Sequence, residues 1–202
     1  QFSPFAIEMD VVIGPKSGDL VCYHPKGKSN DQGTFDQSTV HSQLNSEELP
    51  KLTEVLRMLP EDQRFVIDFK QPTEKAFRLI LENPHIPVDR LVVGVRNLVD
   101  MVKILQIDPN TQVLALFANP NDHQEFQKSG GKYFRLWEKD VTQEQIDKIH
   151  NSGLEVWVTP GYKETANSPR TSGEIDKEKL QKFIQMGIDG ILVNDVELVS
   201  NS

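Results

Sequence analysis

The 202-residue sequence has a single cysteine, Cys22, and no apolar run long enough to cross a membrane. One cysteine excludes an internal disulfide and cannot form a cysteine-based zinc cluster. A spanning helix needs about 20 mainly apolar residues, so we expect no integral membrane segment. Basic residues are also scarce, with 22 Lys and Arg against 30 Asp and Glu and a net charge of −8. Because binding to a nucleic-acid backbone usually requires a basic patch, we expect no nucleic-acid partner.

Short apolar runs alternate with segments of helical period along most of the chain. This alternation predicts repeated βα units around a parallel sheet, and no linker interrupts it, so residues 1–202 are expected to form a single domain. A polar excursion at about residues 13–46 departs from the pattern, and within it the run LVCYH predicts an extra strand before a polar loop. Seven principal strands are expected at 6–12, 65–69, 91–95, 113–117, 133–137, 155–159 and 190–193. Six helices are expected at 49–59, 73–82, 98–105, 120–128, 142–152 and 176–186, and the polar segment 161–173 is a candidate lid.

Two of the predicted strands carry carboxylates in a compatible pattern. Glu8 and Asp10 alternate in AIEMDVVI and therefore share one face, as do Asp68 and Lys70 in FVIDFK. Three close anionic groups raise one another's pKa, so such a cluster requires a divalent cation or basic partners. Oxygen ligands suit a hard cation, Mg²⁺ or Ca²⁺. The alternative is an ordinary solvated or salt-bridged pair of strand carboxylates.

Strand parity also groups several basic and aromatic side chains. In a β/α barrel the chemistry collects at the carboxyl ends of the strands, on the inner face. Parity places Lys70, Arg96 and Arg135 on that face, where they either contact a phosphate or form ordinary ion pairs with the carboxylates. An aromatic such as Trp157 either fills the barrel mouth or packs against the apolar part of a substrate. The predicted substrate-binding residues are Arg96, Arg135, Trp137, Trp157 and Asn194.

Several pieces of the chain form a recognisable series when they are taken in order. The first are IEMDVV, the turn that follows it, and VCYH. KLTEVLRMLP then leads into FVIDFK, and GLEVWVTPG and IQMGIDGILVNDVELV follow near the end. In this order the pieces are similar to the glycerophosphodiester phosphodiesterase family, and the last two resemble its last two βα units. The resemblance covers nearly the whole chain and implies a TIM-type (β/α)8 barrel.

The resemblance also implies roles for individual residues. Glu8, Asp10 and Asp68 match the metal ligands, the third of which is more often a glutamate in the family. His24 matches one of two catalytic histidines that exchange protons with the attacking and leaving oxygens, a role that suits a group titrating near neutrality. Lys70 matches the lysine that neutralises the phosphate. The implied cofactor is a divalent cation, and the implied partner is a small-molecule phosphodiester.

The chain departs from the family pattern at several places. The His-Arg-Gly end of the first strand and the Glu-Asn-Thr segment after it do not occur, so we expect the barrel to lack its first βα unit, with one acid/base histidine, in this chain. Pro25 replaces the aspartate that usually follows the second histidine. Asn194 and Asp195 replace the usual Thr-Asp end of the last strand. These changes favour a divergent branch with altered substrate preference.

Three functions are therefore weighed. The leading one is metal-dependent hydrolysis of glycerophosphodiesters to glycerol 3-phosphate and an alcohol. A second is phospholipase D-like activity on lysophospholipids or sphingolipids, for which Phe2, Phe5 and Trp157 are the few candidate apolar contacts. A third is a non-catalytic barrel, or a fragment, that binds a metal or phosphate ligand, and the absent histidine motif supports it.

Overall fold

The computed structural model describes residues 6–27, 29–30, 33–44, 49–117, 119–161, 171–195 and 197. The chain divides into two compact units, one ending at Val113 and the other comprising the chain from Leu114 onward. The expectation of a single domain stays a prediction. Among the described residues, no helix combines the length and the apolar character that crossing a bilayer requires.

The N-terminal unit is built on four strands in the order β2-β1-β3-β4. They are β1 (Ala6–Ile13), β2 (Leu20–Cys22), β3 (Arg64–Phe69) and β4 (Leu91–Val95). β3 is parallel to both β1 and β4, whereas β2 returns antiparallel to β1 after a tight turn. The register pairs Asp10 with Asp68 and Asp68 with Gly94. The predicted charged residues of this unit thus lie within, or directly after, three neighbouring strands.

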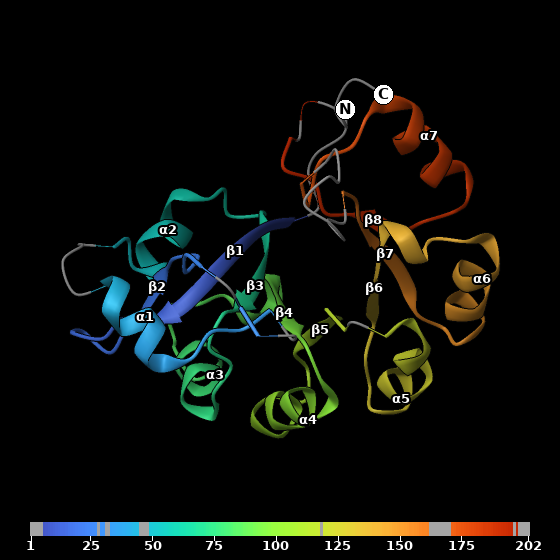
Figure 1. Cartoon of the computed structure of the whole chain (residues 1–202). Helices are drawn as coiled ribbons and strands as arrows, with labels where there is room; N and C mark the ends of the chain where they lie inside the picture. Colours follow the sequence, from blue (N-terminus) through green and yellow to red (C-terminus); the bar gives the residue numbers. More distant parts are fainter. Residues whose placement is uncertain are drawn as a thin grey trace. The chain divides into compact units, whose positions relative to one another are not determined.

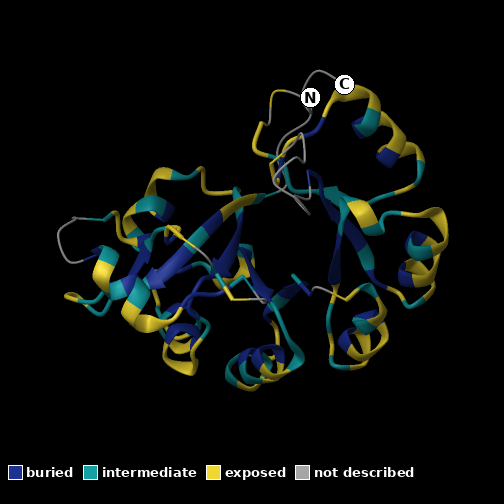
Figure 2. Ribbon diagram, viewed as in Figure 1, coloured by how far each residue is buried: buried dark blue, intermediate teal, exposed yellow. Residues whose placement is uncertain are grey.

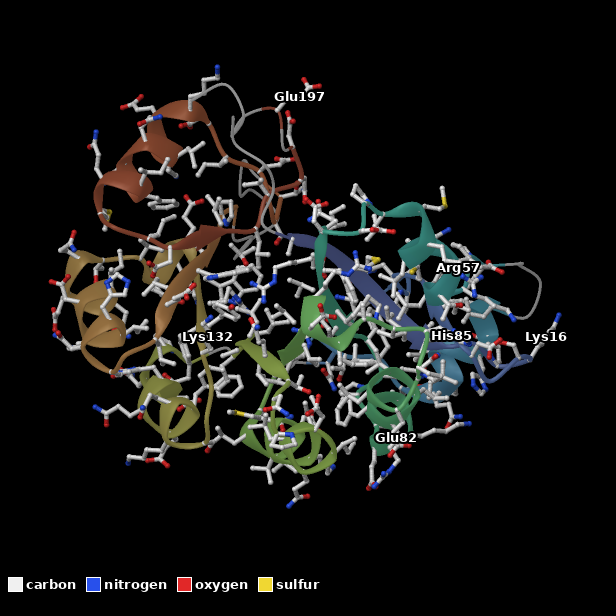
Figure 3. The ribbon with its side chains drawn as sticks, turned by 180° about the vertical axis from the view of Figure 1, so that it is seen from behind. Lys16, Arg57, Glu82, His85, Lys132 and Glu197 are labelled. Atoms are coloured by element: carbon white, nitrogen blue, oxygen red, sulfur yellow. The ribbon has the colours of Figure 1, made fainter. Side chains whose placement is uncertain are left out.

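Helices follow the strands of this unit in sequence (Figure 1). They are α1 (Gln37–Leu44), α2 (Leu52–Met58), α3 (Glu74–Leu81), the 3₁₀ turn η1 (Val88–Arg90) and α4 (Leu98–Ile107). Thr73 and Asn97 cap α3 and α4 with side-chain oxygens that accept from backbone N–H groups of the first turn. Charged side chains such as those of Arg57 and Glu82 are exposed on the helical side of the unit (Figure 3).

The C-terminal unit continues the same alternation with parallel strands in the order β5-β6-β7-β8. The strands are β5 (Gln112–Ala115), which crosses the division between the units, β6 (Tyr133–Trp137), β7 (Glu155–Thr159) and β8 (Gly190–Ile191). The helices are η2 (Pro120–Asp122), α5 (His123–Lys128), η3 (Glu138–Asp140), α6 (Gln143–Asn151) and α7 (Lys177–Gln185). The side chains of Thr142 and Asp176 cap α6 and α7.

Burial follows the strands, which are mostly buried, whereas the helices are buried on one side only (Figure 2). In the N-terminal unit, Val12 packs with Val21, Phe35, Val40 and Leu44 in a small core of its own. This core joins the polar excursion to β1, so the excursion is a packed part of the unit.

The predicted elements agree with the structure except in the excursion and at the ends of the chain. The bounds predicted for β4, β6 and β7 are confirmed, while β8 is shorter than predicted and ends at Ile191. The expectation of a polar loop after β2 is confirmed for the described residues up to Asp36. It is wrong for residues 37–44, which form α1 and bury Val40 and Leu44. Most of the candidate lid, residues 162–170, lies outside the described residues.

Candidate metal and phosphate site

Three carboxylates from the neighbouring strands β1 and β3 come together. Glu8 and Asp10 lie on the same face of β1, and the register sets Asp10 beside Asp68 of β3. One oxygen from each of the three lies within 4.8 Å of the others. The structure therefore brings together the three predicted metal ligands in a group that could hold a cation.

Two cations lie in direct contact with this group. The Lys70 ammonium is 2.7 Å from Asp10 Oδ1 and 2.6 Å from Asp68 Oδ2. The Arg96 guanidinium, at the end of β4, donates through Nη2 to the same Asp68 oxygen. Burial alone would lower the pKa of Lys70, but the charges of Asp68 and Asp10 outweigh it and keep that pKa above its ordinary value. Lys70 is therefore charged at neutral pH.

The charges of this cluster do not balance when every member is ionised. Three carboxylates face two cations, which leaves one negative charge. The pKa of Glu8 is raised to about 8, first by desolvation among the surrounding protein atoms and then by the charges of Asp10 and Asp68, with Lys70 acting in the opposite direction. Glu8 nevertheless keeps contact with solvent, which moderates the desolvation. Without a cation, the excess charge is therefore removed by a proton on Glu8, which hydrogen-bonds to Asp10.

The residues present fit a hard divalent cation. Asp68 is 5% exposed, and its Oδ1 is buried without a hydrogen-bond partner among the described residues, although Oδ2 has two. A buried carboxylate oxygen left unpaired is costly, and coordination of a cation would satisfy it. Carboxylate oxygens suit Mg²⁺ and Ca²⁺ but do not choose between them.

His24 follows β2 and lies on the excursion next to these strands. The preceding residue, Tyr23, donates its backbone N–H to the Asp10 carbonyl at 2.9 Å. The His24 ring meets the Phe35 ring edge to face, with centroids 5.8 Å apart. Phe35 in turn donates its N–H to the Lys70 carbonyl at 2.9 Å. Backbone hydrogen bonds to two charged members of the cluster thus hold the segments on either side of the exposed His24 ring.

Four of the predicted substrate-binding residues belong to the C-terminal unit. Arg135 is buried, donates from Nη2 to the Leu116 carbonyl at 2.9 Å and stacks on the Trp137 ring, 4.0 Å from its centroid. Trp157 is buried against Tyr133, with ring centroids 5.1 Å apart. The predicted set within this unit is Arg135, Trp137, Trp157 and Asn194.

The side chain of Asn194 is hydrogen-bonded to the backbone of a neighbouring segment. Its amide nitrogen donates to the Ser172 carbonyl at 2.8 Å, and its backbone N–H donates to the Gly173 carbonyl at 3.0 Å. Asn194 thus holds the chain at positions 172 and 173. The substrate-binding role of all four residues stays a prediction.

Two residues of the excursion contact the predicted site although the sequence analysis did not single them out. Phe35 packs against His24, and Gly33 lies against Arg96. The signal for Phe35 was available, since it is a large apolar residue within a polar run. Nothing in the sequence marks Gly33, because its neighbour is 63 positions away along the chain.

Comparisons with known proteins give a likeness in structure alone. No family model matches the sequence, and no curated protein matches it. A chain from Galdieria sulphuraria assigned to the glycerophosphodiester phosphodiesterases has a TM-score of 0.73 at 16% identity, covering 98% of this chain and 84% of that one. A glycerophosphodiester phosphodiesterase from Parabacteroides distasonis has a TM-score of 0.67 at 16% identity, with coverages of 98% and 83%.

A third solved structure carries a bound product. It is an Oleispira antarctica phosphodiesterase in complex with sn-glycerol-3-phosphate, with a TM-score of 0.66 at 16% identity and coverages of 93% and 80%. At this identity the three likenesses establish architecture. The chain has the TIM-barrel-type α/β fold of the glycerophosphodiester phosphodiesterases.

Proposed function

We propose that this protein is a glycerophosphodiester phosphodiesterase that hydrolyses its substrate to glycerol 3-phosphate and an alcohol with the help of a divalent cation. One observation carries the proposal: in a fold shared with such enzymes, three carboxylates converge with a buried, unpaired oxygen of Asp68 beside two cations. The Oleispira antarctica relative in fold holds sn-glycerol-3-phosphate, the product that this reaction would give.

Glu8, Asp10 and Asp68 would hold the cation, which is Mg²⁺ or Ca²⁺. Once bound, it would polarise the phosphoryl oxygens and neutralise part of the charge that develops on them. The chain's own contribution begins with the arrangement of these ligands, since Asp68 is fixed by two ion pairs and Asp10 by one. The ligands are thus oriented before any cation arrives.

Lys70 and Arg96 would supply positive charge next to the phosphate. Both are mostly buried, so the charges are poorly screened by water. Lys70 lies between Asp10 and Asp68, and Arg96 reaches Asp68 from the next strand. Together with a divalent cation, they would outweigh the three carboxylates, so an anionic substrate would meet the local positive charge that the acidic chain lacks as a whole.

His24 would hold and move the proton of the reaction. Its ring is exposed, and the backbone contacts of Tyr23 and Phe35 keep this stretch of the excursion beside the carboxylate strands. An imidazole can both accept and return a proton, as this role requires. For Arg135, Trp137, Trp157 and Asn194 of the C-terminal unit, substrate binding stays a prediction from the sequence.

The test uses the full chain with glycerophosphocholine, measuring choline release with Mg²⁺, with Ca²⁺ or with a chelator. We expect turnover that the chelator abolishes and that is lost in His24→Ala and Asp68→Asn. The matched control is Asp19→Asn, since Asp19 also pairs with a lysine, Lys51, but on an exposed surface. Cation binding without turnover would instead support a non-catalytic binder, and turnover confined to lysophosphatidylcholine or sphingomyelin would support the phospholipase D-like alternative.

A further inference from the structure

Gly33 lies directly against the guanidinium of Arg96. A β-carbon at position 33 would stand 3.0 Å from Nη1 and 3.3 Å from Cζ of Arg96, closer than ordinary van der Waals contact. The backbone of Gly33 also has a φ of +71°, which a residue with a side chain adopts only under strain. Position 33 therefore excludes a side chain for two separate reasons, and only one of them involves Arg96.

Arg96 is not free to yield to such a side chain. Its Nη2 donates to Asp68 Oδ2, the oxygen that Lys70 also contacts. The Arg96 side chain is only 14% exposed. Moving the guanidinium would take a partner away from a buried carboxylate, which is expensive in a poorly solvated place.

The backbone of Gly33 is held as well. Its N–H donates to the Asn30 carbonyl at 2.9 Å, and the next residue, Thr34, donates its N–H to the Asn30 side-chain oxygen at 2.9 Å. Phe35 is bonded to the Lys70 carbonyl at the end of β3. Gly33 is thus anchored to the strand that carries Asp68, so neither side of its contact with Arg96 can move without breaking hydrogen bonds or ion pairs.

We propose that Gly33 is a positioning residue: by presenting bare backbone to Arg96 it holds the guanidinium on Asp68 Oδ2 and thereby sets the affinity of the site for a phosphate group. The phosphate part of this inference rests on the proposed function, whereas the positioning of Arg96 does not. Gly33 itself touches no reacting atom and acts through Arg96. A side chain at position 33 would weaken the anion site without removing any charge.

The experiment that tests this role compares Gly33→Ala with Gly18→Ala. Gly18 has nearly the same φ, +73°, but a β-carbon there meets nothing within 4 Å. Both variants impose a similar backbone strain, which should lower the melting temperature by about 2–4 °C each. Only Gly33→Ala is expected to lower the melting temperature by more than this. It should also raise the KM for glycerophosphocholine about tenfold, with a smaller change in kcat.

The same pair is then measured in an Arg96→Lys background, because lysine lacks the Nη atoms, and Nη1 is the atom that would lie nearest the alanine. The excess loss of melting temperature and the rise in KM should disappear there. Equal losses in Gly33→Ala and Gly18→Ala, or an excess that persists in Arg96→Lys, would overturn the proposal.

Two readouts do not depend on turnover, the melting temperatures and the binding of inorganic phosphate measured by titration calorimetry. A wild type that binds phosphate but hydrolyses nothing would contradict the proposed function. The melting temperatures and phosphate affinities of the variants would then decide the role of Gly33. A wild type that binds no phosphate would overturn the phosphate half of the inference, and the melting temperatures would still decide the positioning of Arg96.

Discussion

The two units share the βα alternation but place different chemistry at the ends of their strands. In the N-terminal unit, Lys70 forms direct ion pairs with Asp10 and Asp68, and Asp68 also pairs with Arg96. In the C-terminal unit, the buried Arg135 is held by an aromatic face and a backbone carbonyl. Opposite charge, oriented dipoles and an aromatic ring face can all stabilise a buried charge, and of these only opposite charge brings carboxylate oxygens that a cation could use.

Of the substitutions that test this difference between the units, removal of Asp68 should have the largest effect. Asp68→Ala leaves Lys70 and Arg96 buried without their shared partner, so we expect a loss of about 3–5 kcal/mol in the free energy of unfolding. Cation binding should be lost as well. Urea denaturation and calorimetric titration with Mg²⁺ and Ca²⁺ measure the two effects. Asp19→Ala, at an exposed ion pair, should cost about 0–1 kcal/mol, and a similarly small loss for Asp68→Ala would contradict the ionic account.

Removal of the Arg135 charge tests the other unit. Arg135→Met keeps an unbranched apolar stem but loses the guanidinium, which stacks on Trp137 and donates to the Leu116 carbonyl. We expect a loss of about 1–3 kcal/mol in the free energy of unfolding, measured in urea, with unchanged cation affinity. If Arg135→Met lowered the cation affinity as well as the stability, the polar groups of the two units would not be independent.

Cation binding should be linked to a proton through Glu8. Its carboxyl carries a proton at pH 7 in the cation-free protein, because its pKa is raised to about 8. Binding of Mg²⁺ or Ca²⁺ must displace that proton, so the apparent affinity should rise by up to about tenfold per pH unit below pH 8 and then level off. Calorimetry in two buffers of different ionisation enthalpy counts the protons released, and Glu8→Gln should release none.

The same group predicts how stability depends on pH without a cation. Between pH 4.5, the ordinary pKa, and about 8, the folded protein binds a proton at Glu8 that the unfolded chain has lost. The free energy of unfolding should therefore fall as the pH rises through this range. A saturating cation should remove this slope, which urea titrations at several pH values would detect. An unchanged slope in Glu8→Gln would assign it to another group.

The smallest expected effect concerns helix α1 of the excursion and leaves the ionic cluster unchanged. Asp36 caps α1, since its carboxylate accepts from the Thr39 N–H and from the hydroxyls of Ser38 and Thr39. These bonds lower the pKa of Asp36 below its ordinary 3.8. The cap is complete above pH 3.8 and weakens as the pH falls through the lowered pKa. Amide hydrogen exchange in α1 should therefore become faster in acid in the wild type, and it should be faster at every pH in Asp36→Ala. Exchange rates in α1 that change neither with acid nor with the substitution would exclude the cap.

Much of the fold and part of the site could be predicted from the sequence, for local reasons. Alternation places Glu8 and Asp10 on one face, and apolar runs bounded by polar turns define β4, β6 and β7. Helix α1 was missed because its residues, QSTVHSQL, are mostly polar and form no apolar stripe, although Asp36 before it is a strong N-cap. Its helical state depends on packing of Val40 and Leu44 against distant residues of β1 and β2.

Contacts between distant segments could not be predicted in the same way. The sequence places Lys70 and Asp68 on one face but does not show that the ammonium bridges two carboxylates. The pairing of Arg96 with Asp68 depends on the register of β3 and β4, and the contact with Gly33 depends on the path of the excursion. These are tertiary outcomes that no local pattern encodes.

The short outermost strands have a consequence for handling the protein. The strand order ends in β2, with three residues, and in β8, with two. Outer strands expose backbone groups that can recruit another chain and seed aggregation, and short ones offer little template for it. At β2 the exposure is reduced further, since the Cys22 N–H donates to the Pro50 carbonyl and Val21 forms a bridge with Lys51. Self-association through added strands should therefore be weak at both of these edges, even in concentrated solution.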